Sequence, residues 1–141
     1  MKKLNKVLLV DDSEATNYMN QYFFEKIDAC HEIVVATNGK EGLDYLSSIP
    51  KEKWSTDIPE LIMLDIKMPV MDGFEFLEQY EKFPIEMRKS IVTVLLTTSM
   101  SITDRDKAKE YESVKSFLNK PLTVSQLKEM LDGIFDTVKT S

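Results

Sequence analysis

The chain has 141 residues, of which 43% are hydrophobic and 30% charged, and this composition fits one globular domain with a hydrophobic core. Its formal net charge of -6 argues against a module that binds nucleic acid through phosphate contacts. The single cysteine, Cys30, excludes an internal disulfide, and no set of Cys and His ligands for zinc exists. The first apolar run, 7–10, is too short for a signal peptide or a membrane span, so we expect a cytoplasmic protein.

The first half of the chain alternates short apolar runs with helical patterns. Residues 7–10 (Val-Leu-Leu-Val) are apolar without alternation, which is typical of a strand buried on both faces of a parallel sheet. A helix is predicted over 13–28, a second strand over 31–36, and a short helix over 38–50. The polar segment 51–60 is predicted to be a long surface loop. In the first helix the following apolar side chains recur at helical spacing: Ala15, Tyr18, Met19, Tyr22, Phe23 and Ile27.

The second half repeats the alternation three times. The predicted elements are strands over 61–64, 91–96 and 114–118 and helices over 73–83, 103–112 and 123–138. The last helix has the clearest signals, because Thr123 and Gln126 form a capping box and apolar residues recur along one face as far as Val138.

Five strands that alternate with five helices predict an α/β fold with a doubly wound, five-stranded parallel sheet. With the flavodoxin-like strand order 2-1-3-4-5, the first and third strands are neighbours. The ligand site of such a sheet lies at the carboxyl ends of its strands, where the order of the strands reverses.

Polar side chains stand where the predicted strands end. These residues are Asp11, Asp12, Asp65, Thr97 and Lys120. In a parallel sheet they share one edge, and three carboxylates in one cleft repel each other unless a cation is present. Mg²⁺ prefers oxygen ligands of this kind. The sequence therefore predicts a magnesium site beside a hydroxyl and an ammonium group.

These groups suit phosphoryl transfer. An aspartate can act as the nucleophile and form an aspartyl-phosphate, while Mg²⁺ and a lysine neutralise the charge of the transferred group. Asp65 is the predicted nucleophile, because it stands alone at its strand end, whereas the adjacent Asp11 and Asp12 suit a metal-holding pair. A single aspartate at a strand end more often only caps a turn, so the prediction depends on the whole set.

Over essentially its whole length, the chain resembles the receiver domains of two-component response regulators, in particular the single-domain chemotaxis-type regulators. The matching segments are Asp11-Asp12 after Val-Leu-Leu-Val, Asp65 with the following Ile-Lys-Met-Pro-Val-Met-Asp-Gly, Leu96-Thr97, and Lys120-Pro121. Each segment is a weak signal by itself. In this order and at these spacings they are highly specific.

The resemblance implies a role for each matching position. Asp65 is the expected phosphoacceptor, and Asp11, Asp12 and Asp65 are the expected Mg²⁺ ligands together with the backbone carbonyl of Lys67. Lys120 is expected to bind the phosphoryl group. Two further residues form the implied switch, Thr97 through its hydroxyl and Phe117 through its ring. By analogy, the Lys120-Pro121 peptide bond is expected to be cis.

The resemblance also implies partners. We expect a single receiver domain over residues 1–141 without an output domain, phosphorylated by a sensor histidine kinase or a histidine phosphotransfer protein. It signals by binding another protein through the face formed by 103–138, or by passing the phosphoryl group on, and it contacts neither nucleic acid nor membrane. It is not expected to be an enzyme beyond its own phosphorylation and dephosphorylation.

Two alternatives remain. One is a receiver-like interaction module that works without phosphorylation, although the five site residues are all present. The other is an aspartyl-phosphate phosphatase of the haloacid dehalogenase type. That family needs a second aspartate two residues after the nucleophile, and this chain has Lys67 there.

Overall fold

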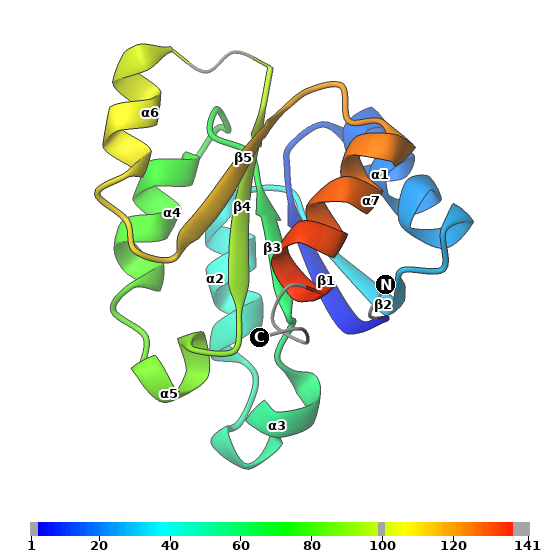
Figure 1. Cartoon of the computed structure of the whole chain (residues 1–141). Helices are drawn as coiled ribbons and strands as arrows, with labels where there is room; N and C mark the ends of the chain where they lie inside the picture. Colours follow the sequence, from blue (N-terminus) through cyan, green and yellow to red (C-terminus); the bar gives the residue numbers. More distant parts are fainter. Residues whose placement is uncertain (1–2, 99–100, 137–141) are drawn as a thin grey trace.

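Five parallel strands form one sheet in the computed structural model, which describes residues 3–98 and 101–136 (Figure 1). The strands are β1 (Leu4–Val10), β2 (Cys30–Ala36), β3 (Leu61–Leu64), β4 (Val92–Thr97) and β5 (Val114–Asn119). Their order in the sheet is β2-β1-β3-β4-β5, and every pairing is parallel. The predicted strand order and fold class are confirmed.

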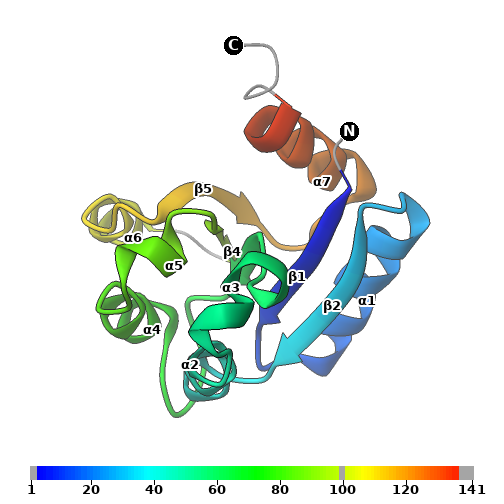
Figure 2. The same cartoon turned by 90° about the horizontal axis from the view of Figure 1, so that it is seen from below.

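Helices cover both faces of this sheet. They are α1 (Glu14–Lys26), α2 (Gly39–Ser47), α3 (Trp54–Asp57), α4 (Gly73–Tyr80), α5 (Ile85–Arg88), α6 (Ile102–Ala108) and α7 (Val124–Leu131). Figure 2 shows α1 and α7 on one face and α2, α4 and α6 on the other. Because both faces are covered, the strand tips and their loops are the accessible part of the sheet.

The number of helices differs from the prediction, since the described residues contain seven α-helices where the sequence predicted five. The additional helices are the single turns α3 and α5, too short for a periodic apolar pattern. The predicted surface loop over 51–60 contains α3 and a 3-10 turn, Lys51–Lys53. Trp54 organises this segment, because its Nε1 donates to the carbonyl of Ile49 at 3.2 Å and its ring packs against the core.

The central strands are buried on both sides, as their lack of alternation predicted. One face contributes Leu8, Val10, Ile62, Leu64 and Leu95 to the core under α2 and α4. The other face packs Val7, Leu9, Leu61, Met63 and Val94 against α1 and α7.

Helix α1 buries only part of the apolar stripe that its spacing predicts, because Phe23 and Ile27 pack against the core but other members do not. The buried residues of α1 are Asn17, Asn20 and Phe24. The side chains of Tyr18, Met19 and Tyr22 are instead exposed by 70%, 44% and 47%. The helix therefore buries two amides beside Phe24 and also presents apolar side chains to solvent, so its polar and apolar residues are not separated onto two faces as in ordinary amphipathic packing.

The last predicted helix is present as α7, with the expected capping box between Thr123 and Gln126. A π-helical turn, Asp132–Asp136, follows it, and Val138 lies outside the described residues. Within the described part of the chain, none of the helices has the length and apolar character needed to cross a membrane.

Candidate functional site

The strand register brings the predicted site residues to one edge of the sheet. Val10 pairs with Leu64 across β1 and β3, so Asp11 and Asp65 leave the sheet side by side. The backbone N–H of Asp65 donates to the carbonyl of Val10 at 2.9 Å, which continues this pairing past the last strand residue. On the other side, the N–H of Lys120 donates to the carbonyl of Thr97 at 2.8 Å.

Three carboxylates meet at this edge. Oxygens of Asp11, Asp12 and Asp65 all lie within 4.8 Å of one another. Asp11 and Asp65 are buried, with 5% and 6% of their surface exposed, whereas Asp12 is exposed. Oxygen ligands of one Mg²⁺ lie about 3 to 4 Å apart, since each stands about 2.1 Å from the ion. The three acids therefore fit a hard divalent cation.

Lys120 supplies the ammonium of the site. Its Nζ lies 2.6 Å from Oδ2 of Asp11 and 3.5 Å from Oδ1 of Asp65, and only 11% of its side chain is exposed. The peptide bond between Lys120 and Pro121 is cis, as the resemblance implied. One cation thus bridges two buried carboxylates, and the acid that it holds more closely is Asp11.

The charge on Asp65 is unfavourable in the metal-free site. Burial raises the pKa of its carboxyl to about 6, and the neighbouring charge of Asp11 acts in the same direction. Lys120 opposes both effects but does not cancel them. Asp65 therefore gains more than an exposed aspartate would from a second cation nearby.

The remaining predicted residues lie around this centre. Thr97 is the last residue of β4 and is 1% exposed. Phe117 is half-buried in β5 and packs against the core from the same side as α4. Lys67 has an exposed side chain in the loop after Asp65, and the role of its carbonyl stays a prediction.

The loop after Asp65 is held close to the acceptor. Asp72 caps α4 through a capping box with Glu75, and the N–H of Gly73 donates to the carbonyl of Ile66 at 2.7 Å. Val70 has a φ of 71°, which is a strained conformation for a β-branched residue.

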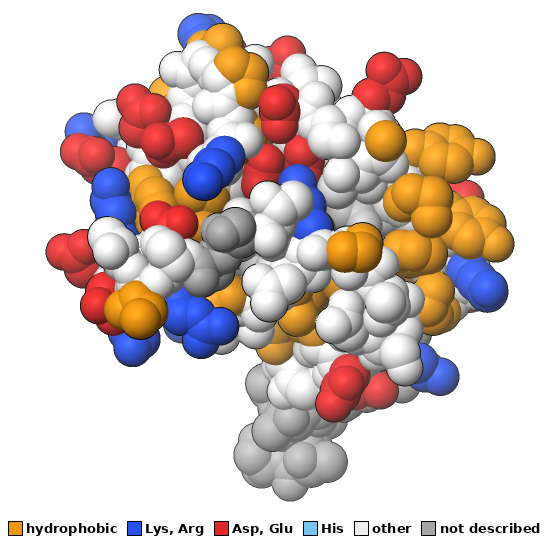
Figure 3. Space-filling model, turned by 90° about the horizontal axis from the view of Figure 1, so that it is seen from above, with side chains coloured by type: hydrophobic (Ala, Val, Ile, Leu, Met, Phe, Trp, Pro, Cys, Tyr) orange, Lys and Arg blue, Asp and Glu red, His pale blue; other side chains and the backbone are white. Residues whose placement is uncertain are grey.

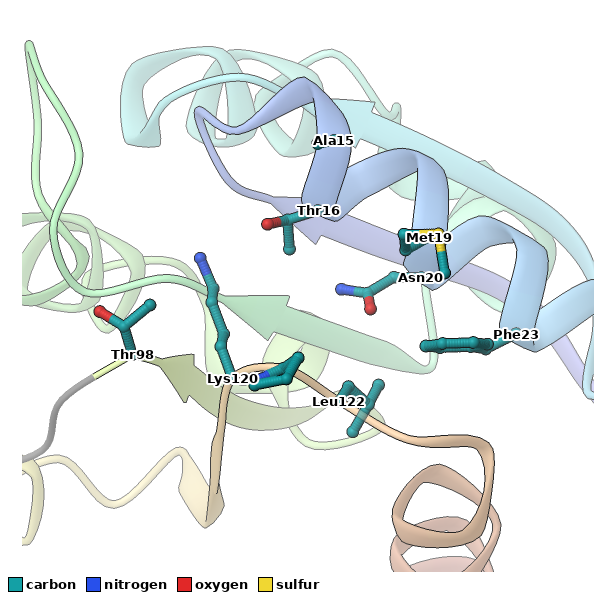
Figure 4. Close-up of a pocket in the computed structure, with 9 residues that line it drawn as sticks. Ala15, Thr16, Met19, Asn20, Phe23, Thr98, Lys120 and Leu122 are labelled. Carbon is teal, nitrogen blue, oxygen red and sulfur yellow. The ribbon is translucent and has the colours of Figure 1, made fainter.

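A cavity that the sequence did not predict opens beside Lys120. Its volume is about 390 Å³, and α1 forms one wall through Thr16, Met19, Asn20 and Phe23. Thr98, Lys120, Pro121 and Leu122 form the opposite wall (Figure 4). Of these α1 residues, the sequence analysis assigned only Met19 and Phe23, and it did so by helical spacing. The signal that it overlooked was the pair of asparagines inside the helix, Asn17 and Asn20.

Comparisons with known proteins agree with this arrangement. Residues 7–132 match the family model described as response regulator receiver domain. The chain is 34% identical over 129 residues to the probable methanogenesis regulatory protein FilR2 of Methanothrix harundinacea, covering 91% of this chain and 79% of that protein. It is 31% identical to the response regulator Rcp1 of a Synechocystis strain, covering 91% and 84% of the two chains.

Solved structures lead to the same family. A two-component response regulator from Cytophaga hutchinsonii superposes with a TM-score of 0.83 at 25% identity, covering 96% of this chain and 99% of that one. The family model spans most of the chain, and the strand order and the acidic strand edge agree with it. The protein therefore belongs to the response regulator receiver domains of two-component signalling systems.

Proposed function

We propose that this chain is a phosphorelay receiver that accepts a phosphoryl group from a phosphohistidine onto Asp65. The observation that carries the proposal is the convergence of Asp11, Asp12, Asp65 and Lys120 at one edge of the sheet. Buried acids that share one ammonium are costly to maintain, so their presence supports a function that uses them.

The chemistry follows from the position of Asp65. A carboxylate oxygen of Asp65 attacks the phosphorus of the phosphohistidine. The new O–P bond forms as the P–N bond breaks, and the histidine nitrogen leaves with the electron pair. Mg²⁺ held by Asp11, Asp12 and Asp65 would supply positive charge to offset both the carboxylates and the phosphoryl oxygens. The ammonium of Lys120, 3.5 Å from Oδ1 of Asp65, is placed to pair with a phosphoryl oxygen.

The signal would leave through a change around Thr97 and Phe117. The added charge on Asp65 attracts the hydroxyl of Thr97, and Phe117 adjusts in β5, which alters the surface formed by α6, β5 and α7. This is the 103–138 surface expected from the resemblance, of which 137 and 138 lie outside the described residues. A partner that binds the two forms differently then reads the signal.

Self-modification is the reaction that the site supports best. A phosphatase of the haloacid dehalogenase type would need an acid at the position of Lys67, whose side chain is exposed and basic. An interaction module that works without phosphorylation has no use for two carboxylates buried beside Lys120.

The test is incubation of the purified chain with a small acyl phosphate and Mg²⁺, followed by intact-mass measurement. We expect the mass of one added phosphoryl group, its location at Asp65 by peptide mapping, and its absence when a chelator removes Mg²⁺. A chain that binds Mg²⁺ but stays unmodified with acyl phosphate and with phosphorylated histidine kinases would overturn the proposal.

The surroundings of the site favour a protein as the natural donor. The exposed side chains of Tyr18, Met19 and Tyr22 lie on α1, and Figure 3 shows hydrophobic side chains gathered on the α1 side of the face that carries the acidic site. Met19 also lines the cavity that reaches Lys120 (Figure 4). Apolar and aromatic surface beside a reactive group is typical of protein contacts. We therefore infer that the donor docks on α1.

Met19→Glu is expected to slow phosphotransfer from a protein donor by about tenfold or more, because it places a charge in an apolar contact. The labelling rate with small acyl phosphate should stay within about twofold of the wild-type rate. The matched control is Ile85→Glu, an equally drastic change at an exposed residue of α5, at the far end of the sheet in Figure 1. Equal slowing with both kinds of donor would assign Met19 to the acceptor site instead.

A further inference from the structure

Asn17 makes a contact to the acidic edge that neither the sequence pattern nor the family resemblance assigned. Its Nδ2 donates to the backbone carbonyl of Asp11 at 2.8 Å, from the first turns of α1. The side chain is 4% exposed, and its Oδ1 has no hydrogen-bond partner among the described residues. A buried amide oxygen without a hydrogen bond lowers the free energy of unfolding. The presence of Asn17 at this buried position therefore needs an explanation other than stability.

Every polar group of Asp11 has a defined partner. Its N–H donates to the carbonyl of Ala36 in β2 at 3.0 Å. Its Oδ1 accepts from the N–H of Ser13 at 2.9 Å, and its Oδ2 pairs with Lys120. Asn17 completes the set by binding the carbonyl. The peptide unit before Asp11 is thus fixed by the sheet, and the peptide unit after it is fixed by Asn17.

This second peptide unit joins Asp11 to Asp12, and its planarity means that one hydrogen bond at the carbonyl sets its orientation. Asp12 needs such support, because its side chain is exposed and its carboxylate has no hydrogen bond or ion pair within the described residues. The orientation of this peptide plane, together with the rotamer of the Asp12 side chain, sets where its carboxylate lies relative to Asp11 and Asp65.

We propose that Asn17 is a positioning residue of the metal site, which holds the Asp11–Asp12 peptide so that both carboxylates face one cation. The proposal rests on the proposed function, since it assumes that the three acids bind Mg²⁺. Residues that do not contact the metal but orient its ligands through hydrogen bonds commonly contribute about tenfold or more to metal affinity. The unpaired Oδ1 fits this role, because only the N–H donor of the amide is needed.

The experiment is calorimetric titration of Mg²⁺ into the full chain, with thermal unfolding measured on the same samples. Asn17→Ala and Asn17→Leu both remove the donor, and the leucine keeps the volume, so an effect that they share is not caused by a cavity. We expect each to weaken Mg²⁺ binding by about tenfold. If the alanine variant does not fold, the leucine variant carries the comparison.

The matched control is Asn38→Ala. Asn38 caps α2 by accepting a hydrogen bond from the N–H of Glu41 at 2.9 Å, so its loss also removes one asparagine-to-backbone contact. We expect it to lower the unfolding temperature while Mg²⁺ affinity stays within about twofold of the wild-type value. Wild-type affinity in both Asn17 variants would overturn the positioning role alone, whereas a wild-type chain that binds no Mg²⁺ would overturn the proposed function with it.

Discussion

Asp65→Asn is expected to abolish phosphorylation of the chain under conditions that label the wild-type protein completely. The amide has nearly the same shape as the carboxylate but lacks the negatively charged oxygen that attacks phosphorus. The measurement is intact mass after incubation with acyl phosphate and Mg²⁺. Asp12→Asn is the informative comparison, because it removes a carboxylate of the same cluster while leaving the acceptor in place. We expect slower labelling of that variant and none of Asp65→Asn; labelling of both would assign the nucleophile to another residue.

Asp65→Asn is also expected to stabilise the metal-free fold near neutral pH. The pKa of Asp65 in the folded chain is about 6, above its value of about 3.9 in an unfolded chain. A raised pKa means that stability from the protonated acid is complete below about pH 4 and is lost as the pH rises to about 6. Asparagine avoids this loss, so Asp65→Asn should exceed the wild type by about 2 kcal/mol at neutral pH and by little at pH 4. Urea unfolding at the two pH values, without divalent cations, measures the difference.

The parts of the fold that were predictable are those where the local pattern and the tertiary environment agree. The run Val-Leu-Leu-Val before Asp11 has no alternation, and both faces of β1 are buried. Because parallel strands end on one edge, the positions of Asp11, Asp65 and Lys120 in the sequence were enough to bring them together. The site could thus be placed from topology before any side-chain contact was known.

Helix α1 shows where this reasoning fails. Of its predicted apolar stripe, Phe23 and Ile27 pack against the core, but Tyr18, Met19 and Tyr22 are exposed. The helix buries Asn17 and Asn20 together with Phe24. Periodicity measures where apolar residues gather and assumes that they face the core. That assumption breaks down when a helix borders a polar site and an interaction surface. The local exception therefore coincides with the two functional surfaces proposed for α1.

Gly73→Ala is expected to be the most destabilising single-methyl change near the site. Gly73 is the first residue of α4, where helix propensity alone would favour alanine by about 1 kcal/mol. A Cβ at this position would lie 2.5 Å from the carbonyl oxygen of Asp65 and 2.8 Å from the Cα of Ile66, both backbone atoms of the acceptor loop. These atoms cannot rotate away as a flexible side chain could, so the loop itself must shift.

The steric effect exceeds the propensity, and we expect a net loss of about 3 kcal/mol in the free energy of unfolding together with slower labelling of the displaced Asp65. Gly133→Ala is the matched control, because outside its chain neighbours and the backbone of its own helix no described atom lies within 4 Å of the position that its Cβ would occupy. That variant should be neutral or more stable than the wild type by less than about 1 kcal/mol. The measurement is the urea midpoint of unfolding of the two variants. Equal midpoints would mean that the acceptor loop shifts to accommodate a methyl group at little cost. Close packing of Gly73 against the backbone of Asp65 would then not be what holds the acceptor in position.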